Sequence, residues 1–155
     1  PLSLQLYPDS ALRTKCEPVE RFDAWLADVF EEMLVLMRMH DGIGLAGPQV
    51  GLTKRFFVAE PQGQTLCLAN PVILAGSGRD RTGEGCLPLP GLDIEIERDL
   101  QVEVHGYDAH GKKQEYHLQG LWARVVQHEI DHLDGVLICD HQESSASQNK
   151  GLRGP

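Results

Sequence analysis

Residues 127–135 read QHEIDHLDG, a stretch in which two histidines lie four positions apart and a glutamate follows the first of them. In a helix, residues four apart lie one above the other, so His128 and His132 share a face. Two imidazoles on one buried face can share a divalent cation, and Glu129 can then act as the base for a water molecule that the cation activates. The competing interpretation is a pair of core histidines whose ring nitrogens are satisfied by hydrogen bonds.

The sequence around this motif predicts a helix over residues 119–134. Leu121 and Val125 share the stripe of His128, which indicates that this face of the helix points inward. Gly135 follows in the position that a helix C-terminus favours, because glycine adopts a left-handed backbone without a steric penalty. The motif is therefore predicted to lie on an amphipathic helix that ends just before this glycine.

The other elements follow from hydrophobic periodicity. An apolar stripe at three- to four-residue spacing predicts a helix over residues 19–40. Short apolar or alternating runs predict strands over residues 55–60, 65–76 and 93–108. Residues 77–85 are polar, which is typical of a loop, and residues 108–113 indicate a hairpin turn into a further strand. Strands followed by a late helix indicate an α+β fold.

Composition limits the classes of function. The chain has 155 residues, of which 41% are hydrophobic and 24% charged, a balance typical of a globular protein. We predict one domain over residues 1–141 and a flexible polar tail over residues 142–155. The net charge of −9 argues against general affinity for nucleic acid, and no apolar run approaches the roughly 18–20 residues needed to cross a membrane. With no secretory signal visible at residues 1–15, we expect a cytoplasmic protein. Because no distinct dimerisation stripe stands out, we expect a monomer.

A catalytic zinc-type site has three protein ligands and one open position, so the motif needs one more ligand. Proteases of the metzincin kind place a third histidine where this chain has Ile138. Thermolysin-like enzymes use a later glutamate, and this chain offers only Glu143. Cys86, in the glycine-flanked segment EGCLPLPG (84–91), is the leading upstream candidate, although a lone cysteine is otherwise a small buried apolar residue.

Three stretches together resemble the motifs of peptide deformylases: GIGLAGPQVG at 42–51, EGCLPLPG at 84–91 and QHEIDHLDG at 127–135. They come in the order and at about the separations found in that family, and the resemblance covers most of the chain. It implies an α+β fold in which antiparallel sheets surround the central helix that carries HExxH. It also implies a hydrolase that removes the formyl group from the N-terminal formyl-methionine of newly made polypeptides and releases formate.

The resemblance assigns the reaction to particular residues. Cys86, His128 and His132 would bind one divalent metal ion, usually Fe²⁺ in this family, with Zn²⁺, Ni²⁺ or Co²⁺ able to take its place. Glu129 would take a proton from the attacking water and later pass it to the leaving amine. The partners would be N-formyl-methionyl nascent peptides.

The carbonyl oxygen gains negative charge during such a reaction and needs hydrogen-bond donors. Gln49 would offer its side-chain amide and Leu87 its backbone N–H. Gly42 and Gly44 would let the backbone of the first motif approach a ligand closely, so that an extended peptide could pair with the strand edge.

Two further assignments come from the resemblance. Ile43, Leu121 and Val125 would form walls of a pocket for the methionine side chain, although the residues alone favour a core role for each. Glu84 and Arg98 would form a buried ion pair near the metal loop, although two surface charges are the simpler expectation.

The chain also departs from the usual family pattern. Gly47 stands where alanine is common, which predicts a loosened loop before Gln49, and Pro88 replaces a serine without removing the N–H of Leu87. Residues 142–155 offer no long basic helix, so only a transient contact with the ribosome is expected. A bacterial cell, a phage-infected cell or an organelle is each compatible with these features.

Three alternatives to an active deformylase stay open on sequence alone. One is a relative that binds formyl-peptides but has lost activity. A second is a structural metal protein with a fourth ligand such as Cys139 or His141. A third is a metalloprotease, against which Ile138 argues.

Overall fold

The computed structural model describes residues 2–6, 9–86 and 89–141, with the backbone alone for residues 86 and 89–92. Its α-helices are α1 (Ala24–Met39) and α2 (Leu121–Leu133). Its strands are β1 (Gly44–Ala46), β2 (Phe56–Ala59), β3 (Leu66–Ser77), β4 (Asp80–Cys86), β5 (Leu89–Arg98), β6 (Gln101–Tyr107) and β7 (Lys113–Gln119). Short 3₁₀ turns cover Ser10–Arg13, Gly47–Val50 and Pro61–Gly63.

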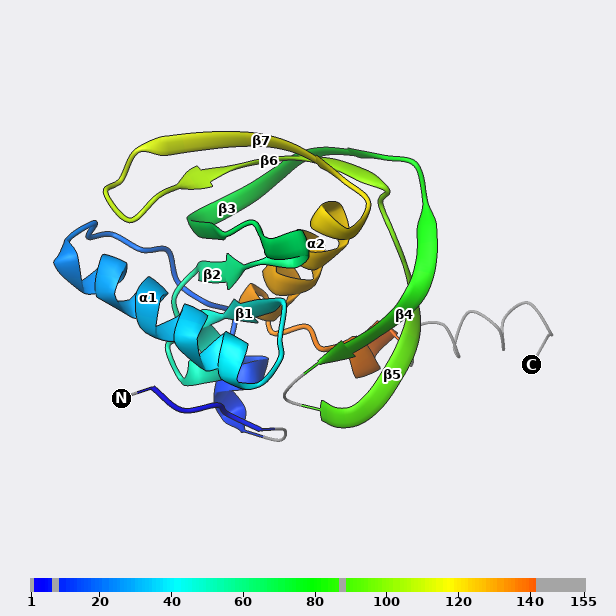
Figure 1. Ribbon diagram of the computed structural model, residues 1–155, viewed down its shortest axis with the longest axis horizontal. Coiled ribbons are helices and arrows are strands. Elements are labelled where there is room, and N and C mark those ends of the chain that lie inside the picture. The colour runs from blue at the N-terminus through cyan, green and yellow to red at the C-terminus, as the bar shows by residue number, and fades with distance from the viewer. Residues whose placement is uncertain (1, 7–8, 87–88, 142–155) are drawn as a thin grey trace.

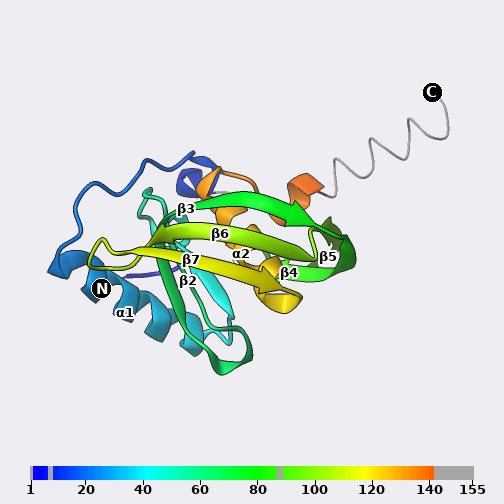
Figure 2. The same ribbon diagram turned by 90° about the horizontal axis from the view of Figure 1, so that it is seen from above.

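The strands form two antiparallel sheets around α2. Five strands pair in the order β1-β2-β3-β6-β7, and β4 pairs with β5 alone. In Figure 1 the strands β3, β6 and β7 arch over α2, while β4 and β5 curve down the side away from α1. Figure 2, seen from above, places α2 beneath these same strands. The predicted α+β fold with antiparallel sheets around the HExxH helix is confirmed.

Strand β2 shows why both helices pack onto this sheet. All four of its residues, FFVA, are buried. Phe57 and Ala59 belong to the apolar cluster that includes α2, whereas Phe56 and Val58 belong to the cluster that includes α1. Because successive side chains of a strand point to opposite faces, an uninterrupted apolar strand needs cover on both sides.

Helix α1 begins later than predicted. The side chain of Asp23 accepts a hydrogen bond from the N–H of Trp25, which caps the helix at its first turn. Before that, the backbone N–H of Val19 donates to Asn70 Oδ1 at 2.8 Å, and its carbonyl accepts from Asn70 Nδ2 at 2.9 Å. This side chain satisfies the backbone of Val19 outside any helix, so the predicted start at residue 19 is wrong.

The single strand predicted over residues 93–108 is two strands in different sheets. Strand β5 ends at Arg98 and β6 begins at Gln101. At the corner, Gln127 of α2 holds the backbone of Asp99, accepting from its N–H at 3.1 Å and donating to its carbonyl at 2.9 Å. The buried side chains fall at even-numbered positions both before the corner, as at Ile96, and after it, as at Val102. The alternation of polar and apolar residues therefore does not reveal where one strand ends and the next begins.

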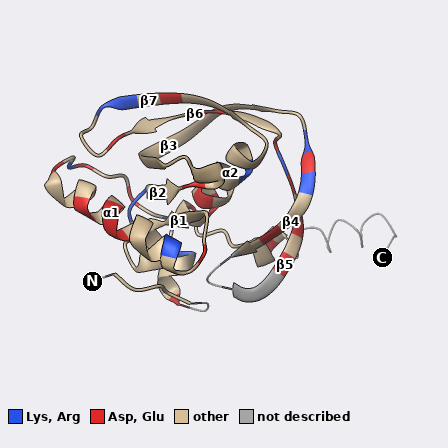
Figure 3. Ribbon diagram, viewed as in Figure 1, with Lys and Arg blue, Asp and Glu red and all other residues tan. Residues whose placement is uncertain are grey.

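Residues 77–85, predicted as a loop, contain most of β4. The strand pairs with β5 from Asp80↔Arg98 onward, and Arg81 Nε lies 3.2 Å from Glu95 Oε1 across the pair. Figure 3 shows the alternation of acidic and basic residues along this two-stranded sheet. A strand whose outer side chains are charged has the composition of a loop, which explains the error.

The later elements match expectation more closely. The pair Tyr107↔Lys113 closes the hairpin between β6 and β7, and Asp108 Oδ1 accepts from the N–H groups of His110 and Lys112 in its turn. Helix α2 ends at Leu133, and Gly135 follows with φ of 74°. In the part of the chain described, no helix combines the length and hydropathy needed to cross a membrane. The predicted tail over residues 142–155 lies outside the described residues.

Candidate active site

Helix α2 brings the two imidazoles of the motif together. Nε2 of His128 lies 3.2 Å from Nε2 of His132, and the ring centroids are 4.9 Å apart. Two nitrogens at about 2.0–2.1 Å from one tetrahedral cation would be about 3.3 Å apart. The separation of the two Nε2 atoms therefore fits a shared divalent metal ion.

Glu84 of β4 orients the first of these rings. Its Oε1 accepts a hydrogen bond from His128 Nδ1 at 2.7 Å. With Nδ1 as the donor, the lone pair of His128 lies on Nε2, the atom that faces His132. Although burial lowers the pKa of His128, the hydrogen bond to Glu84 and the charge of Glu129 outweigh it and raise that pKa.

Two buried arginines hold Glu84 in place. Arg98 Nε donates to Glu84 Oε2 at 2.6 Å and its Nη2 donates to Oε1 at 2.9 Å, while Arg124 Nη1 donates to Oε2. We call Glu84, Arg98, Arg124 and His128 the Glu84 clamp. Burial alone would raise the pKa of Glu84, but the bonds from His128 and Arg98 outweigh it and lower that pKa to about 2. Glu84 is thus an anion, and the predicted ion pair with Arg98 is confirmed.

Glu129 lies in the core beside the first motif. It is 3% exposed, and among the described residues its Oε1 has no hydrogen-bond partner. Burial raises its pKa to about 7, against the opposing effect of the His128 charge. A Cβ built on Gly44 would lie 2.4 Å from Glu129 Oε2, so only glycine lets β1 pass this close. A buried oxygen without a protein partner is what a site for a bound polar group requires.

The loop after β1 fixes the amide of Gln49. Its Oε1 accepts from the N–H of Ala46 at 2.7 Å, and its side chain is buried. A Cβ on Gly47 would lie 2.6 Å from both the carbonyl oxygen of Leu52 and Cε1 of Phe56. Gly47 is thus a point of close packing, and the predicted loosening of this loop is wrong.

The three apolar residues assigned to the pocket divide into two groups. Val125 is 5% exposed, as a residue of the inner stripe should be. Leu121 is 41% exposed and Ile43 46% exposed, so the inward orientation predicted for Leu121 is wrong. Leu121 is the first residue of α2, beyond the cover of the sheets. Gly42 lies in the turn after α1, where its N–H donates to the carbonyl of Met37 at 2.9 Å.

Cys86 is the last residue of β4, two positions beyond Glu84, and its backbone is in register with Leu89. Its side chain and the whole of Leu87 lie outside the described residues, as does Pro88. Within the described side chains, no group of three or more His, Cys, Asp or Glu residues could hold a metal ion. The assignment of Cys86 as the third ligand and of Leu87 as a donor therefore stays a prediction.

The comparisons with known proteins decide the family. The sequence profile described as "Polypeptide deformylase" matches residues 1–148. The chain belongs to this family. A peptide deformylase of Rhodopirellula baltica is 43% identical over 145 residues, which cover 90% of this chain and 72% of that protein. The family is one of metal-dependent hydrolases that remove N-formyl groups, so the predicted family, enzyme class and function are confirmed.

Solved structures agree with this assignment. The crystal structure of peptide deformylase from Thermotoga maritima matches with a TM-score of 0.89 and 40% identity, covering 90% of this chain and 96% of that one. A peptide deformylase from Synechococcus elongatus in complex with actinonin matches with a TM-score of 0.88 and 41% identity, covering 91% and 78% of the two chains. The inactive, structural and protease alternatives have no support from these relatives.

The fourth ligands considered for a structural metal site have other contacts. His141 Nε2 lies 2.8 Å from Asp131 Oδ2. Cys139 packs against the cluster of Ile94, Ile96 and Ile138. These contacts give both side chains a role outside the pair of imidazoles on α2.

Sequence reasoning missed Arg124 and Asp131. Arg124 is 5% exposed, and Asp131 Oδ2 accepts from Arg98 Nη1 at 2.9 Å. Arg124 lies four residues before His128 on the same helix, so a charged residue on the inward stripe was the available signal. Asp131 carried no such signal, since its partner Arg98 comes from a distant strand.

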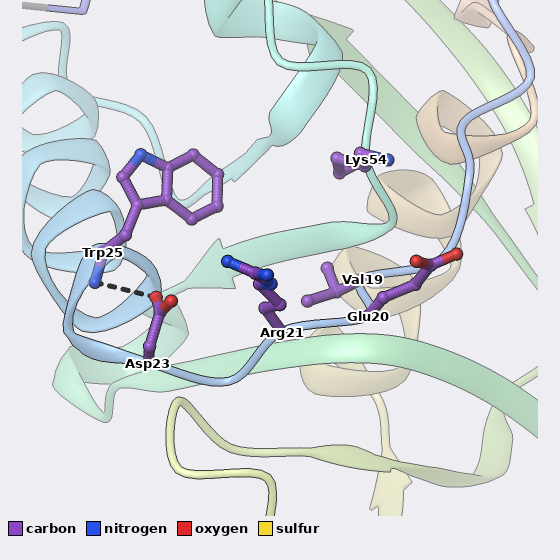
Figure 4. Close-up of a pocket in the computed structure, with 6 residues that line it drawn as sticks. All are labelled: Val19, Glu20, Arg21, Asp23, Trp25 and Lys54. Carbon is purple, nitrogen blue, oxygen red and sulfur yellow. Dashed lines mark hydrogen bonds between the residues drawn. The ribbon is translucent and has the colours of Figure 1, made fainter.

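A separate hollow of about 340 Å³ lies beside the N-terminus of α1. Figure 4 shows its lining residues, which are Val19, Glu20, Arg21, Asp23, Trp25 and Lys54. None of the predicted site residues is among its described lining residues. The lining combines acidic and basic side chains with the Trp25 ring, apart from the residues of the three motifs.

Proposed function

We propose that deformylation takes place where α2 faces β1 and the end of β4, with Cys86, His128 and His132 holding one divalent cation. The observation that carries this proposal is the 3.2 Å approach of the two imidazole Nε2 atoms, with His128 oriented by Glu84. A thiolate with two imidazoles suits Fe²⁺ as well as Zn²⁺, Ni²⁺ and Co²⁺, and we take Fe²⁺ as the native ion. When bound, such a cation supplies Lewis-acid chemistry that makes water a nucleophile near neutral pH.

Glu129 carries the proton of the reaction. Its carboxylate follows His128 in sequence and is buried against Gly44, at the point where β1 passes α2. In this proposal it accepts a proton from the attacking water and delivers it to the amine that leaves when the formyl C–N bond breaks. The formyl carbon departs as formate, and the methionyl nitrogen becomes a free amino terminus.

Gln49 and Leu87 stabilise the charge that develops on the formyl oxygen. The bond from Ala46 N–H to Gln49 Oε1 fixes which way the amide points, so its NH₂ group has a defined direction. The backbone N–H of Leu87 is the second donor in the proposal. Preorganised donors of this kind cost no rearrangement at the moment of reaction.

The substrate binds as an extended peptide along β1. This strand is at the edge of the five-stranded sheet, and Gly42 and Gly44 flank the point of approach. Main-chain hydrogen bonds to an edge strand give affinity that does not depend on side chains, which suits an enzyme that processes many nascent chains. Ile43 and Leu121 have exposed apolar side chains that belong to none of the core clusters formed by the described residues, and with Val125 they form walls for the methionine.

We further propose that the enzyme works as a monomer in the cytoplasm, in transient contact with ribosomes. The relatives named above are bacterial enzymes, and formylated nascent peptides are made where translation occurs.

The test is release of formate from a formyl-Met-Ala-Ser peptide by Fe²⁺- or Ni²⁺-loaded protein under anaerobic conditions. Glu129→Ala should lower kcat by about 10²–10⁴-fold, because it removes the proton carrier. Glu31→Ala, an exposed change on α1, serves as the control and should keep wild-type turnover. Absence of turnover in the loaded wild type, or equal turnover in Glu129→Ala, would overturn the proposal.

A further inference from the structure

Arg124 joins helix α2 to the two strands of the β4–β5 sheet, which lie about 30–40 residues earlier in the sequence. Its Nη1 donates to Glu84 Oε2 and to the carbonyl of Ile96 at 3.0 Å, and its Nη2 donates to the carbonyl of Asp80 at 2.6 Å. The residue is 5% exposed, on the first half of α2. One guanidinium therefore ties α2 to the first residue of β4, to Glu84 in the second half of β4, and to Ile96 near the end of β5.

Glu84 is the residue on which this tie converges. Its two oxygens accept from Arg98, Arg124 and His128, so each oxygen has two donors. A carboxylate whose oxygens each accept two hydrogen bonds is restricted to one side-chain orientation. The planar guanidinium group of arginine donates along fixed directions, so it orients the carboxylate as well as neutralising its charge. The position of Glu84, and through it the ring of His128, depends on both arginines.

The same tie sets the position of the strand end. Cys86 lies two residues after Glu84 on β4, whereas His128 and His132 lie on α2. Arg124 and His128 are one helical turn apart, and both bind Glu84. The register between the strand that ends at Cys86 and the helix that carries the histidines is thus fixed by contacts to Glu84.

We infer that Arg124 is a positioning residue for the metal centre. It acts through Glu84, holding His128 in its metal-facing orientation and β4 at its distance from α2. The inference rests on the proposed function, because it takes Cys86, His128 and His132 as the ligands. Changes to residues that orient metal ligands typically cost 10–100-fold in metal affinity or activity.

A purely structural arginine would give a different result. A structural role means that Arg124→Met lowers stability and leaves the affinity of the folded protein for metal unchanged. A positioning role means that metal affinity falls, and that the fall requires Glu84. A double-mutant cycle separates the two roles, because an effect transmitted through Glu84 disappears when Glu84 no longer has the charge that Arg124 binds.

The experiment measures Co²⁺ affinity by competition with a chelator, together with the visible absorption of bound Co²⁺, in folded full-length protein. The four proteins are wild type, Arg124→Met, Glu84→Gln and the double variant. We expect Arg124→Met to lose 10–100-fold in Co²⁺ affinity with altered Co²⁺ bands. In the Glu84→Gln background the same substitution should change affinity by less than about threefold.

Two control variants separate a change in metal affinity from a general loss of stability and from a loss of charge. Leu34→Ala, in the buried face of α1, lowers stability away from the clamp and should keep wild-type affinity and spectrum. Arg124→Lys keeps the charge but loses the fork, so it should fold and restore only part of the lost affinity.

Three outcomes are decisive. Wild-type affinity and spectrum in folded Arg124→Met or Arg124→Lys would overturn the inference. An equal loss from Arg124→Met in both backgrounds would also overturn it, because the effect would not pass through Glu84. If wild type itself binds no Co²⁺ and releases no formate, the proposed function fails, which is a separate result.

Discussion

The two helices of this molecule differ in how they meet the strands, because α2 adds buried ion pairs to the apolar contacts that both helices make. Helix α1 meets the sheet through apolar side chains, which are Leu26, Val29, Phe30, Met33 and Met37. Helix α2 also has an apolar face toward the sheet, but it meets β4 and β5 through the Glu84 clamp, in which both arginines and Glu84 are buried. The ion pairs of α1, such as Arg38 with Glu60, lie nearer the surface.

The difference shows what each kind of contact does. Apolar burial stabilises without strict direction, so α1 can hold the fold together while its exact contacts vary. Buried charges are costly to desolvate and are stable only in a narrow geometry. A buried ion pair therefore adds little net stability, but it holds the side chains that form it in one orientation. The clamp therefore belongs beside the imidazoles, where direction decides whether a cation can be shared.

Of the substitutions that test this difference, removal of Arg98 should lower the free energy of unfolding the most. Arg98→Met removes two of the four hydrogen bonds to the buried Glu84 carboxylate and the bond to Asp131, and it should lower the free energy of unfolding by about 3–5 kcal/mol. Urea unfolding followed by circular dichroism measures the change. A loss below about 1 kcal/mol would mean that the clamp is effectively solvated, as a surface pair is.

Truncating the α1 face should cost somewhat less and leave chemistry intact. Leu26→Ala removes a fully buried side chain and should lower the free energy of unfolding by about 2–4 kcal/mol. Turnover per folded, metal-loaded molecule should stay within about twofold of wild type, since the cavity lies on the α1 side of the sheet. A loss of turnover well beyond twofold in folded, metal-loaded Leu26→Ala would erase the distinction between the two regions.

The smallest effect concerns the ion pair at the α1 surface. The hydrogen bonds from Arg38 and Thr65 lower the pKa of Glu60 to about 2. Because the folded pKa lies below the unfolded value of about 4.3, this stabilisation is present above that value and is lost as pH falls toward 2. The Tm difference between wild type and Glu60→Gln should be positive at pH 6, smaller than that for Leu26→Ala, and vanish near pH 2. A difference that does not shrink in acid would mean that Glu60 stabilises α1 in some other way.

The features that could be predicted from the sequence are those that depend on local apolar periodicity or on helical spacing. Periodic apolar residues reveal a helix that packs on a sheet, so α1 and α2 were predicted with only their ends in error. The motif residues His128 and His132 were placed together because four-residue spacing on a helix fixes their geometry. Gly44 was expected to let the backbone approach a ligand, which stays a prediction, and the structure shows that it lets β1 pass close to Glu129.

The sequence predictions that were wrong or incomplete concern residues whose contacts lie far away in the sequence. The corner at Asp99 is made by Gln127, which is 28 residues away, and strand alternation continues through it unchanged. Arg124 meets Glu84 over 40 residues of sequence, so its place on the inward stripe of the helix indicates burial but does not identify its partner. Gly47 was taken as a source of looseness, because the packing of Phe56 against it cannot be read from composition.

The central claim is that one thiolate from the end of β4 and two imidazoles from α2 share a cation that has one position left for water. X-ray absorption spectroscopy of Zn²⁺-loaded protein tests it most directly. The account predicts one sulfur at about 2.3 Å and three nitrogen or oxygen neighbours at about 2.0–2.1 Å, with the sulfur lost in Cys86→Ser. A spectrum without sulfur, or a sulfur that survives Cys86→Ser, would contradict it.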